Sequence, residues 1–196
     1  MAKTRRVNGE VFEVMISERR IDARVRQLAA RISRDYRGKV PVLIGILNGS
    51  FIFLADLVRH LTIPCEIDFL KLSSYGDAKI SSGQVRLLKD LNCQVGGRDI
   101  IVVEDIVDSG LSVKYIGELI WKQNPESLRF VTLLYKNDTI RHQITIDYIG
   151  FPIGHEFVIG YGLDFAQRER NLTAVYRVRD HTLPPRRARE RSKTGS

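Results

Sequence analysis

The sequence predicts an α/β fold whose central sheet is largely parallel. Apolar runs of strand length occupy residues 40–47, 100–103 and 128–135, and such runs are typical of strands buried on both faces. Segments in which apolar residues recur at helical spacing alternate with these runs, as in repeated strand–crossover–strand units. Glycine and polar residues separate most of the expected elements.

The first expected element is a helix over residues 17–38. Ser17 is a candidate N-cap, and Glu18 places a negative charge in the first turn, where it suits the helix dipole. Apolar residues then form one helical stripe as far as the stop signal at Gly38. The stripe consists of Ile21, Val25, Leu28, Ala29, Ile32 and Tyr36.

The next segments alternate between strands and breaks. The strand at 40–47 is interrupted by residues 48–50, and a helix is expected at 51–61. Strands are expected at 66–73 and 85–91. Between them, residues 74–83 are polar and contain glycine, so we interpret them as a mobile loop.

The second half continues the alternation. Residues 104–112 are expected to form a loop after the strand at 100–103, followed by a helix and then the strand at 128–135. The apolar face of that helix consists of Val113, Ile116, Leu119 and Ile120. Two short strands are expected at 146–149 and 157–161.

Charge is concentrated at the two ends of the chain. The net charge is +8, but basic residues before residue 7 and after residue 185 leave the body nearly neutral. We therefore expect a basic extension at 1–10, one folded domain at 11–180 and a disordered basic tail at 181–196. Solvated ends are favoured over contacts with polyanions, so nucleic acid is not an expected partner.

Other features point to a cytoplasmic protein without a membrane partner. No apolar segment follows the basic start, as a secretory signal would require. The longest uncharged run, residues 40–55, is too short and too broken to span a membrane. Cys65 and Cys93 form no CxxC motif, which suits a reducing compartment.

A block of chemistry-bearing residues follows the strand at 100–103. Two adjacent carboxylates suit the vicinal hydroxyls of a ribose, or Mg²⁺. Glycine, two hydroxyls and a helix N-terminus then form a potential phosphate cradle. Any one of these residues alone could be a helix cap or a solvated side chain, but together they predict a ribose 5-phosphate site. In order, they are Glu104, Asp105, Asp108, Ser109, Gly110, Leu111 and Ser112.

The sequence Glu-Asp-Ile-Val-Asp-Ser-Gly at 104–110 resembles the phosphoribosyl-pyrophosphate motif of type I phosphoribosyltransferases, especially that of the hypoxanthine-guanine (6-oxopurine) branch. The resemblance extends over about residues 12–178. It implies the type I phosphoribosyltransferase fold, with a largely parallel sheet flanked by helices and a small hood built from the chain ends. It also implies that Glu104 and Asp105 hold the ribose hydroxyls directly or through metal. Asp108 would be the general base.

Two strand ends extend the resemblance. Leu47, Asn48 and Gly49 match a pyrophosphate-binding loop that often carries a non-proline cis peptide, here at Leu47-Asn48. Lys136 directly follows a strand and matches a lysine that donates to O6 of hypoxanthine or guanine. A cation there disfavours the 6-amino group of adenine. Judged alone, these residues could equally form an ordinary strand–helix turn and a surface lysine.

A further match lies near the end of the body. Phe157, which alone would be assigned to the core, corresponds to the aromatic residue that stacks on the purine. The carbonyl of Val158 would read the edge of the base. Asp164 matches an acidic residue near the base and Mg²⁺, and Arg170 matches an arginine that contacts pyrophosphate.

The resemblance predicts transfer of a 5-phosphoribosyl group from phosphoribosyl pyrophosphate to N9 of a 6-oxopurine. Mg²⁺ would be the cofactor, with Glu104, Asp105 and Asp164 as its ligands, and the enzyme would be a homodimer or homotetramer. Ser74 and Tyr75 match the start of a loop that closes over the site and shields a reactive sugar cation from water; an ordinary hairpin loop is the alternative.

Two other functions are compatible with parts of the sequence. The first is a nucleotide-sensing, RNA-binding regulator on the same fold, which the basic ends favour and the nearly neutral body disfavours. The second is a phosphoribosyltransferase that prefers xanthine, which Lys136 and Phe157 do not exclude.

Overall fold

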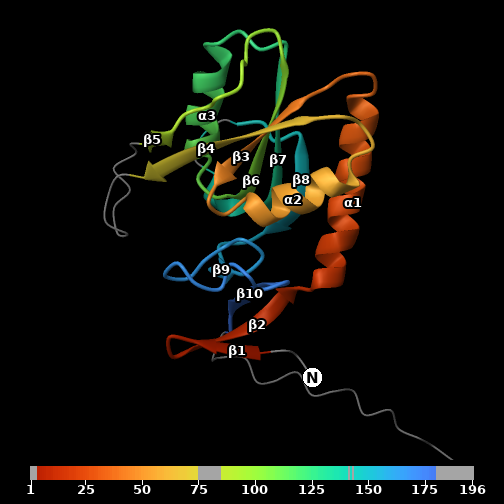
Figure 1. Ribbon diagram of the computed structural model, residues 1–196. Helices are drawn as coiled ribbons and strands as arrows, with labels where there is room; N and C mark the ends of the chain where they lie inside the picture. Colours follow the sequence, from red (N-terminus) through yellow and green to blue (C-terminus); the bar gives the residue numbers. More distant parts are fainter. Residues whose placement is uncertain (1–3, 75–84, 141, 143, 180–196) are drawn as a thin grey trace, which may run out of the picture.

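The computed structural model describes residues 4–74, 85–140, 142 and 144–179. Its elements form a large sheet with helices and a smaller sheet below it (Figure 1). In chain order they are β1 (Thr4–Val7), β2 (Glu10–Ile16), α1 (Glu18–Asp35), β3 (Val42–Leu47), α2 (Phe51–His60), β4 (Glu66–Ser74), β5 (Val85–Lys89), β6 (Asp99–Val107), α3 (Leu111–Trp121), β7 (Ser127–Lys136), the 3-10 turn η1 (Asn137–Thr139), β8 (Tyr148–Ile153), β9 (Val158–Ile159) and β10 (Val175–Val178).

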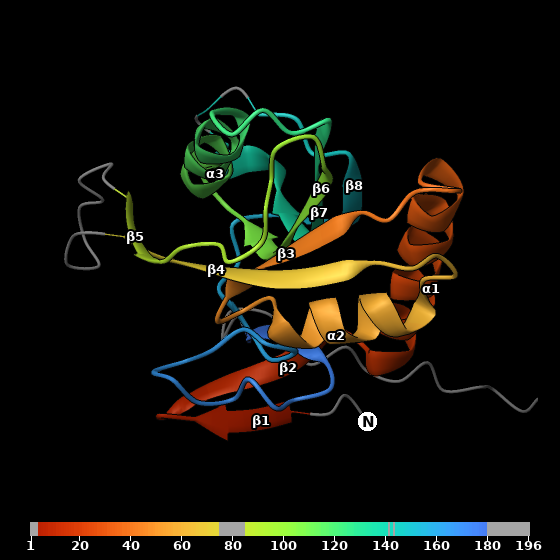
Figure 2. The ribbon, with the colours of Figure 1, turned by 45° about the horizontal axis from the view of Figure 1, so that its top comes forward.

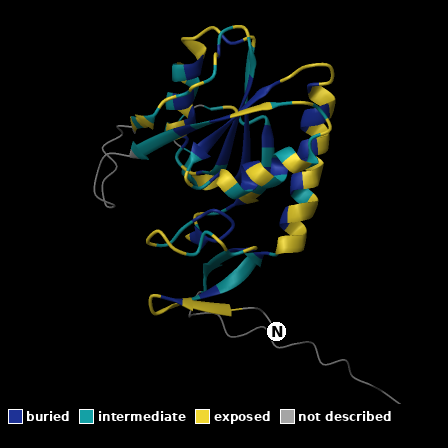
Figure 3. Cartoon of the chain, viewed as in Figure 1, coloured by how far each residue is buried: buried dark blue, intermediate teal, exposed yellow. Residues whose placement is uncertain are grey.

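The large sheet has the strand order β5-β4-β3-β6-β7-β8. Every pair is parallel except β4 and β5, which form an antiparallel edge. The central strands are the most deeply buried, as Figure 3 shows. This arrangement confirms the predicted α/β fold with a largely parallel sheet.

Helices cover both faces of the large sheet. Helices α1 and α2 pack on one face, where Ile21 and Leu57 join Ile101 in one apolar cluster. Helix α3 packs on the opposite face, where Ile116 joins Val102 in a second cluster. Figure 2 shows the two helix layers on either side of the strands. Successive strand residues point to opposite faces, so β6 contributes alternately to both clusters.

Both ends of the described chain meet in the small sheet, in the order β1-β2-β10-β9. All of its pairs are antiparallel. This sheet is the predicted hood. Within the expected basic extension, residues 4–7 form β1, whose first three residues are exposed, and the Arg5 guanidinium pairs with Glu169 at 2.6 Å. Strands β2 and β10 were not expected.

The expected loop at 104–112 was wrong in its first part, because β6 continues to Val107. Pairing with β7 extends as far as Val107 opposite Tyr135, and these backbone hydrogen bonds keep the segment extended. Two other expected strands shift, since β8 begins at Tyr148 and β9 covers Val158–Ile159. Ser17 occupies the N-cap of α1 but makes no side-chain cap; its carbonyl accepts the first helical bonds instead. The loop predicted at 74–83 lies outside the described residues apart from Ser74, which ends β4.

Candidate active site

The carboxyl ends of three neighbouring strands, β3, β6 and β7, meet at one edge of the large sheet. In open α/β sheets, ligands bind outside this edge. The strands lead directly into the turn at 48–50, the segment at 108–112 and Lys136. The predicted site residues on these segments are therefore brought to one side of the molecule.

The turn after β3 lies directly against Asp105. The Leu47–Asn48 peptide is cis, as the resemblance implies. A Cβ on Gly49 would overlap the Asp105 carboxylate, and a Cβ on Gly162 would overlap the Gly49 carbonyl. Glycine is required at both places because three backbone segments approach one another closely. Residues 47–49, β6 and the loop after β9 thus form one packed unit.

Two adjacent carboxylates, Glu104 and Asp105, lie at the centre of this unit. Glu104 is 6% exposed, and burial, followed by the Asp105 charge, raises its pKa well above the ordinary value. Burial also raises the pKa of Asp105 to about 6, with Asp164 contributing and Arg170 opposing. Both shifts record the cost of ionising carboxylates away from water. Strongly shifted pKa values are typical of functional sites.

The segment after β6, where the sequence predicts a phosphate cradle, forms the turn at the start of α3. Gly110 is the N-cap of α3 with φ of 83°, a conformation that other residues rarely adopt. The side chain of Ile144 fills the space where a Cβ would lie. The backbone N–H of Leu111 points to the Ser109 hydroxyl at 3.4 Å. With Ser112 in the first turn, this segment presents backbone and hydroxyl groups at the positive end of the helix.

Lys136 and Asp108 form an ion pair at the next strand end. The Lys136 ammonium lies 2.9 Å from the Asp108 carboxylate. The lysine side chain is 12% exposed and the aspartate side chain 54% exposed. Thr139 supports the segment by donating from its hydroxyl to the Asp108 carbonyl at 3.1 Å. The two residues assigned from the sequence to base recognition and proton transfer are thus direct neighbours.

The loop between β9 and β10 carries the predicted pair Asp164 and Arg170. Their ion pair measures 2.8 Å, and Arg170 also donates to the Gly162 carbonyl at 2.8 Å. The Asp164 carboxylate accepts the backbone N–H of Gln167 at 2.9 Å. Both charged groups lie close enough to Asp105 to influence its pKa. The loop therefore brings one carboxylate and one guanidinium to the Gly49–Asp105 contact.

Phe157 and Val158 lie at the small sheet. Phe157 is 49% exposed, and its ring lies 5.6 Å from that of Phe165 and 6.5 Å from that of Phe12. Val158 is buried in β9. Tyr75 lies outside the described residues, and nothing is described of the Ser74 side chain.

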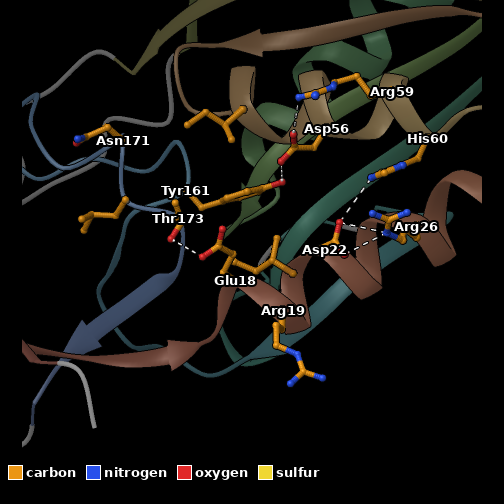
Figure 4. Close-up of a pocket in the computed structure, with 13 residues that line it drawn as sticks. Glu18, Arg19, Asp22, Arg26, Asp56, Arg59, His60, Tyr161, Asn171 and Thr173 are labelled. Carbon is orange, nitrogen blue, oxygen red and sulfur yellow. Dashed lines mark hydrogen bonds and ion pairs between the residues drawn. The ribbon is translucent and has the colours of Figure 1, made fainter. Parts of the chain in front are cut away.

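A cavity of about 680 Å³ lies between α1, α2 and residues 171–173 (Figure 4). None of the site residues predicted from the sequence lines it. Its wall contains Asp56 and Tyr161, whose hydroxyl donates to the Asp56 carboxylate at 2.6 Å. Sequence reasoning missed this pair. The glycines on either side of Tyr161 were the available signal, because they mark a tight turn.

Within the part of the chain that the structure describes, no helix is long and apolar enough to cross a membrane. Among the same residues, no three His, Cys, Asp or Glu side chains gather as a ready metal site.

A largely parallel α/β sheet, adjacent carboxylates near the end of β6 and a glycine-bearing turn after β3 are the features expected of a phosphoribosyltransferase. The family profile described as "Phosphoribosyl transferase domain" matches residues 16–166. Within that class, the chain belongs to the hypoxanthine-guanine phosphoribosyltransferase family, as its similarity to curated relatives shows.

Two of these relatives illustrate the similarity. A hypoxanthine-guanine phosphoribosyltransferase of Bacillus subtilis is 43% identical over 85% of this chain and 92% of its own length. One from Mycobacterium tuberculosis is 40% identical over 91% of this chain and 89% of its own. Solved structures agree. A hypoxanthine-guanine phosphoribosyltransferase from Bacillus anthracis superimposes with a TM-score of 0.81 at 42% identity, covering 84% of this chain and 97% of that one.

Proposed function

We propose that this chain transfers the 5-phosphoribosyl group of phosphoribosyl pyrophosphate to N9 of hypoxanthine or guanine, forming IMP or GMP and pyrophosphate in purine salvage. The observation that carries the proposal is the Lys136–Asp108 pair at 2.9 Å beside the glycine-bearing N-terminus of α3. Lys136, proposed to recognise the base, and Asp108, proposed to accept the proton, then lie next to the predicted 5-phosphate site. The names of the relatives support the same reaction.

The donor would lie across the ends of β3 and β6. Its 5-phosphate accepts hydrogen bonds from the backbone and hydroxyls of residues 109–112. Its ribose hydroxyls face Glu104 and Asp105. Its pyrophosphate lies between the backbone of residues 47–49 and the Arg170 guanidinium, which neutralises charge as the C1–O bond breaks. The electron pair of that bond leaves with the pyrophosphate.

The acceptor base would lie on the Lys136 side. The ammonium donates to O6, which favours a 6-oxopurine over adenine, and the Val158 carbonyl reads the edge of the base. Phe157, which is 49% exposed, stacks on the ring. As N9 bonds to C1 of the ribose, Asp108 accepts the proton from N7.

The carboxylates at the site fit Mg²⁺. Mg²⁺ takes oxygen ligands and is commonly held by one or two carboxylates together with substrate phosphates. Asp105 and Asp164 interact closely enough that Asp164 raises the pKa of Asp105, and Glu104 is the adjacent residue. When bound, the ion would neutralise pyrophosphate charge and compensate the buried carboxylates.

The test is nucleotide formation from phosphoribosyl pyrophosphate and Mg²⁺, with hypoxanthine, guanine, xanthine and adenine offered separately. Turnover of hypoxanthine or guanine, without adenine, is the expected result. Preferential turnover of xanthine would move the acceptor assignment to that base. Absence of turnover with every base, by folded protein that binds the donor, would refute the proposal.

We further propose a cytoplasmic homodimer or homotetramer. Phe51, at the start of α2, is 43% exposed, and Trp121, at the end of α3, is 54% exposed. Large apolar side chains at the surface are compatible with subunit contacts. Light scattering coupled to size exclusion measures the mass directly, and a mass near 22.4 kDa would identify a monomer.

A further inference from the structure

Tyr161 has an unusual backbone for a large side chain. Its φ is 52°, and it lies between Gly160 and Gly162, whose φ values are also positive. Three successive residues in this region reverse the chain within a single turn. The reversal directs the tyrosine side chain toward α2, where it is 5% exposed. A side chain held in a disfavoured conformation is a reason to look for a function.

The Tyr161 hydroxyl makes one short hydrogen bond, to the Asp56 carboxylate at 2.6 Å (Figure 4). Burial, followed by the hydrogen bond to Asp56, raises the pKa of Tyr161 above its ordinary value. The hydroxyl therefore remains a proton donor at every physiological pH. Asp56 lies on α2, the helix that starts directly after the turn at residues 47–50. The bond thus connects the loop after β9 to the helix that continues from the pyrophosphate turn.

The residue after Tyr161 anchors the candidate pyrophosphate arginine. The Gly162 carbonyl accepts from the Arg170 guanidinium at 2.8 Å, and the Gly162 N–H donates to the Arg170 carbonyl at 2.9 Å. Gly162 also lies against the Gly49 carbonyl. A shift of Tyr161 would move Gly162 and, with it, both the arginine and the packing against the turn.

We propose that Tyr161 and Asp56 are positioning residues for the pyrophosphate end of the donor site. Their hydrogen bond fixes the loop after β9 against the turn at 47–50, so that Arg170 and Asp164 face Asp105. Neither residue touches the substrate in this arrangement. The inference rests on the proposed function, because it deepens the assignment of that same site.

The variants Tyr161→Phe and Asp56→Ala each remove the hydrogen bond, the former while keeping the ring. We expect each to raise the KM and the calorimetric Kd for phosphoribosyl pyrophosphate with Mg²⁺ about tenfold, or about 1.4 kcal/mol. The KM for hypoxanthine should stay within about twofold. The donor Kd of the double variant should be no higher than that of either single variant, because both substitutions remove the same hydrogen bond. Asp56→Asn keeps an acceptor oxygen and should restore donor affinity.

Tyr148→Phe is the matched control. Its hydroxyl also donates to a carboxylate, Asp35, at 2.9 Å, but at the C-terminal end of α1. This variant should lower the melting temperature and leave donor affinity unchanged.

Unchanged donor affinity in folded Tyr161→Phe and Asp56→Ala would overturn the proposal, as would an equal loss in Tyr148→Phe. If Tyr161→Phe does not fold, the donor Kd values of Asp56→Ala and Asp56→Asn are compared instead, and equal values would overturn the proposal. The Kd for pyrophosphate, measured with Mg²⁺, tests the positioning role of Tyr161 and Asp56 independently of the proposed reaction. Failure of the wild type to form nucleotide would refute the reaction, while these Kd values would still test the positioning.

Discussion

Lys136 and Asp108 are joined by an ion pair of 2.9 Å between the ends of β7 and β6. Each residue therefore restrains the other in the absence of a purine. The lysine side chain is 12% exposed and the aspartate side chain 54% exposed, so the partner open to an entering ligand is the carboxylate. A base that accepts from the lysine and donates to the aspartate would be recognised by both groups at once.

Replacing Asp108 by Asn tests proton transfer. A general base typically contributes about 10²–10⁴-fold to rate, and asparagine cannot accept the proton. We expect kcat to fall by that order, with the Kd for phosphoribosyl pyrophosphate largely unchanged in calorimetry. Wild-type turnover by the variant would remove Asp108 from this role.

Replacing Lys136 by Met tests base recognition. The change keeps the length of the side chain but removes the charged donor, whose loss costs about 10–100-fold for one charge-assisted hydrogen bond. The kcat/KM for hypoxanthine should fall by that factor, and discrimination against adenine should narrow. Lys114→Met, on the exposed side of α3, is the control and should behave as wild type. Equal losses in both variants would contradict the assignment.

Replacing Asp105 by Asn separates stability from binding. The folded-state pKa is about 6, above the ordinary value near 4, so ionisation destabilises the fold. This cost is absent below about pH 4, grows as the pH rises to about 6 and is complete above it. In urea unfolding, the free energy of unfolding of the ligand-free variant should therefore exceed that of the wild type by about 2–3 kcal/mol at pH 8 and match it at pH 4. It should also bind the donor weakly. A less stable variant at pH 8 would contradict this account.

Replacing Asp68 by Asn tests how the carboxylate of Asp68, in β4, stabilises the segment that follows β5. Asp68 accepts the backbone N–H groups of Phe69, Asn92 and Cys93, and its pKa is lowered to about 2 despite burial. Its stabilising effect is fully present above about pH 4 and is lost as the pH falls through about 2. We expect a loss of about 2 kcal/mol in urea unfolding at pH 7 and little difference near pH 2. Asp22→Asn removes an exposed ion pair with Arg26 and should therefore lose much less stability than Asp68→Asn at pH 7.

Replacing Gly49 by Ala tests the contact between the turn and β6. The added methyl group would overlap the Asp105 carboxylate, so the turn or the carboxylate must move. We expect the KM for phosphoribosyl pyrophosphate to rise at least about tenfold, as displaced binding groups commonly cause. Gly117→Ala is the matched control, because a Cβ there meets only Phe130 at 3.8 Å. That helical change should stabilise the protein by about 0.5–1 kcal/mol without altering the KM.

The main sheet and its helices could be predicted because their signals are local. The apolar run at 40–47 and the stripe from Ile21 to Tyr36 each encode an element without reference to the rest of the chain. Strand β10 could not, since its partner β2 lies more than 150 residues away. Strands β1 and β2 form a local hairpin across Asn8-Gly9, a turn signal that the sequence analysis overlooked. The strand over Glu104 and Asp105 was missed because charged residues disfavour strands, and here pairing with β7 overrides that preference.

The candidate site was predictable where the proposed ligand-binding groups follow strands directly, as at Lys136 and residues 108–112. What could not be predicted was how these groups meet. The Asp105–Gly49 contact and the Tyr161–Asp56 bond join segments that are far apart in the chain, and nothing in their local sequence encodes those distances. Phe157 illustrates the same limit, since its neighbours Phe12 and Phe165 come from different parts of the hood.

The pairing of β10 with β2 has a consequence for biosynthesis. A ribosome releases residues in order, so β2 and the strands of the large sheet can leave the exit tunnel well before residues 175–178. Until then, β2 lacks the neighbour that joins it to β9, and the loop bearing Asp164 and Arg170 has no closed sheet to hold it. The large sheet can therefore form during synthesis, whereas the hood is completed only after translation has passed β10. A nascent chain stalled before that point would contain the proposed phosphate cradle at residues 109–112, while the loop proposed to contact pyrophosphate would not yet be held in place.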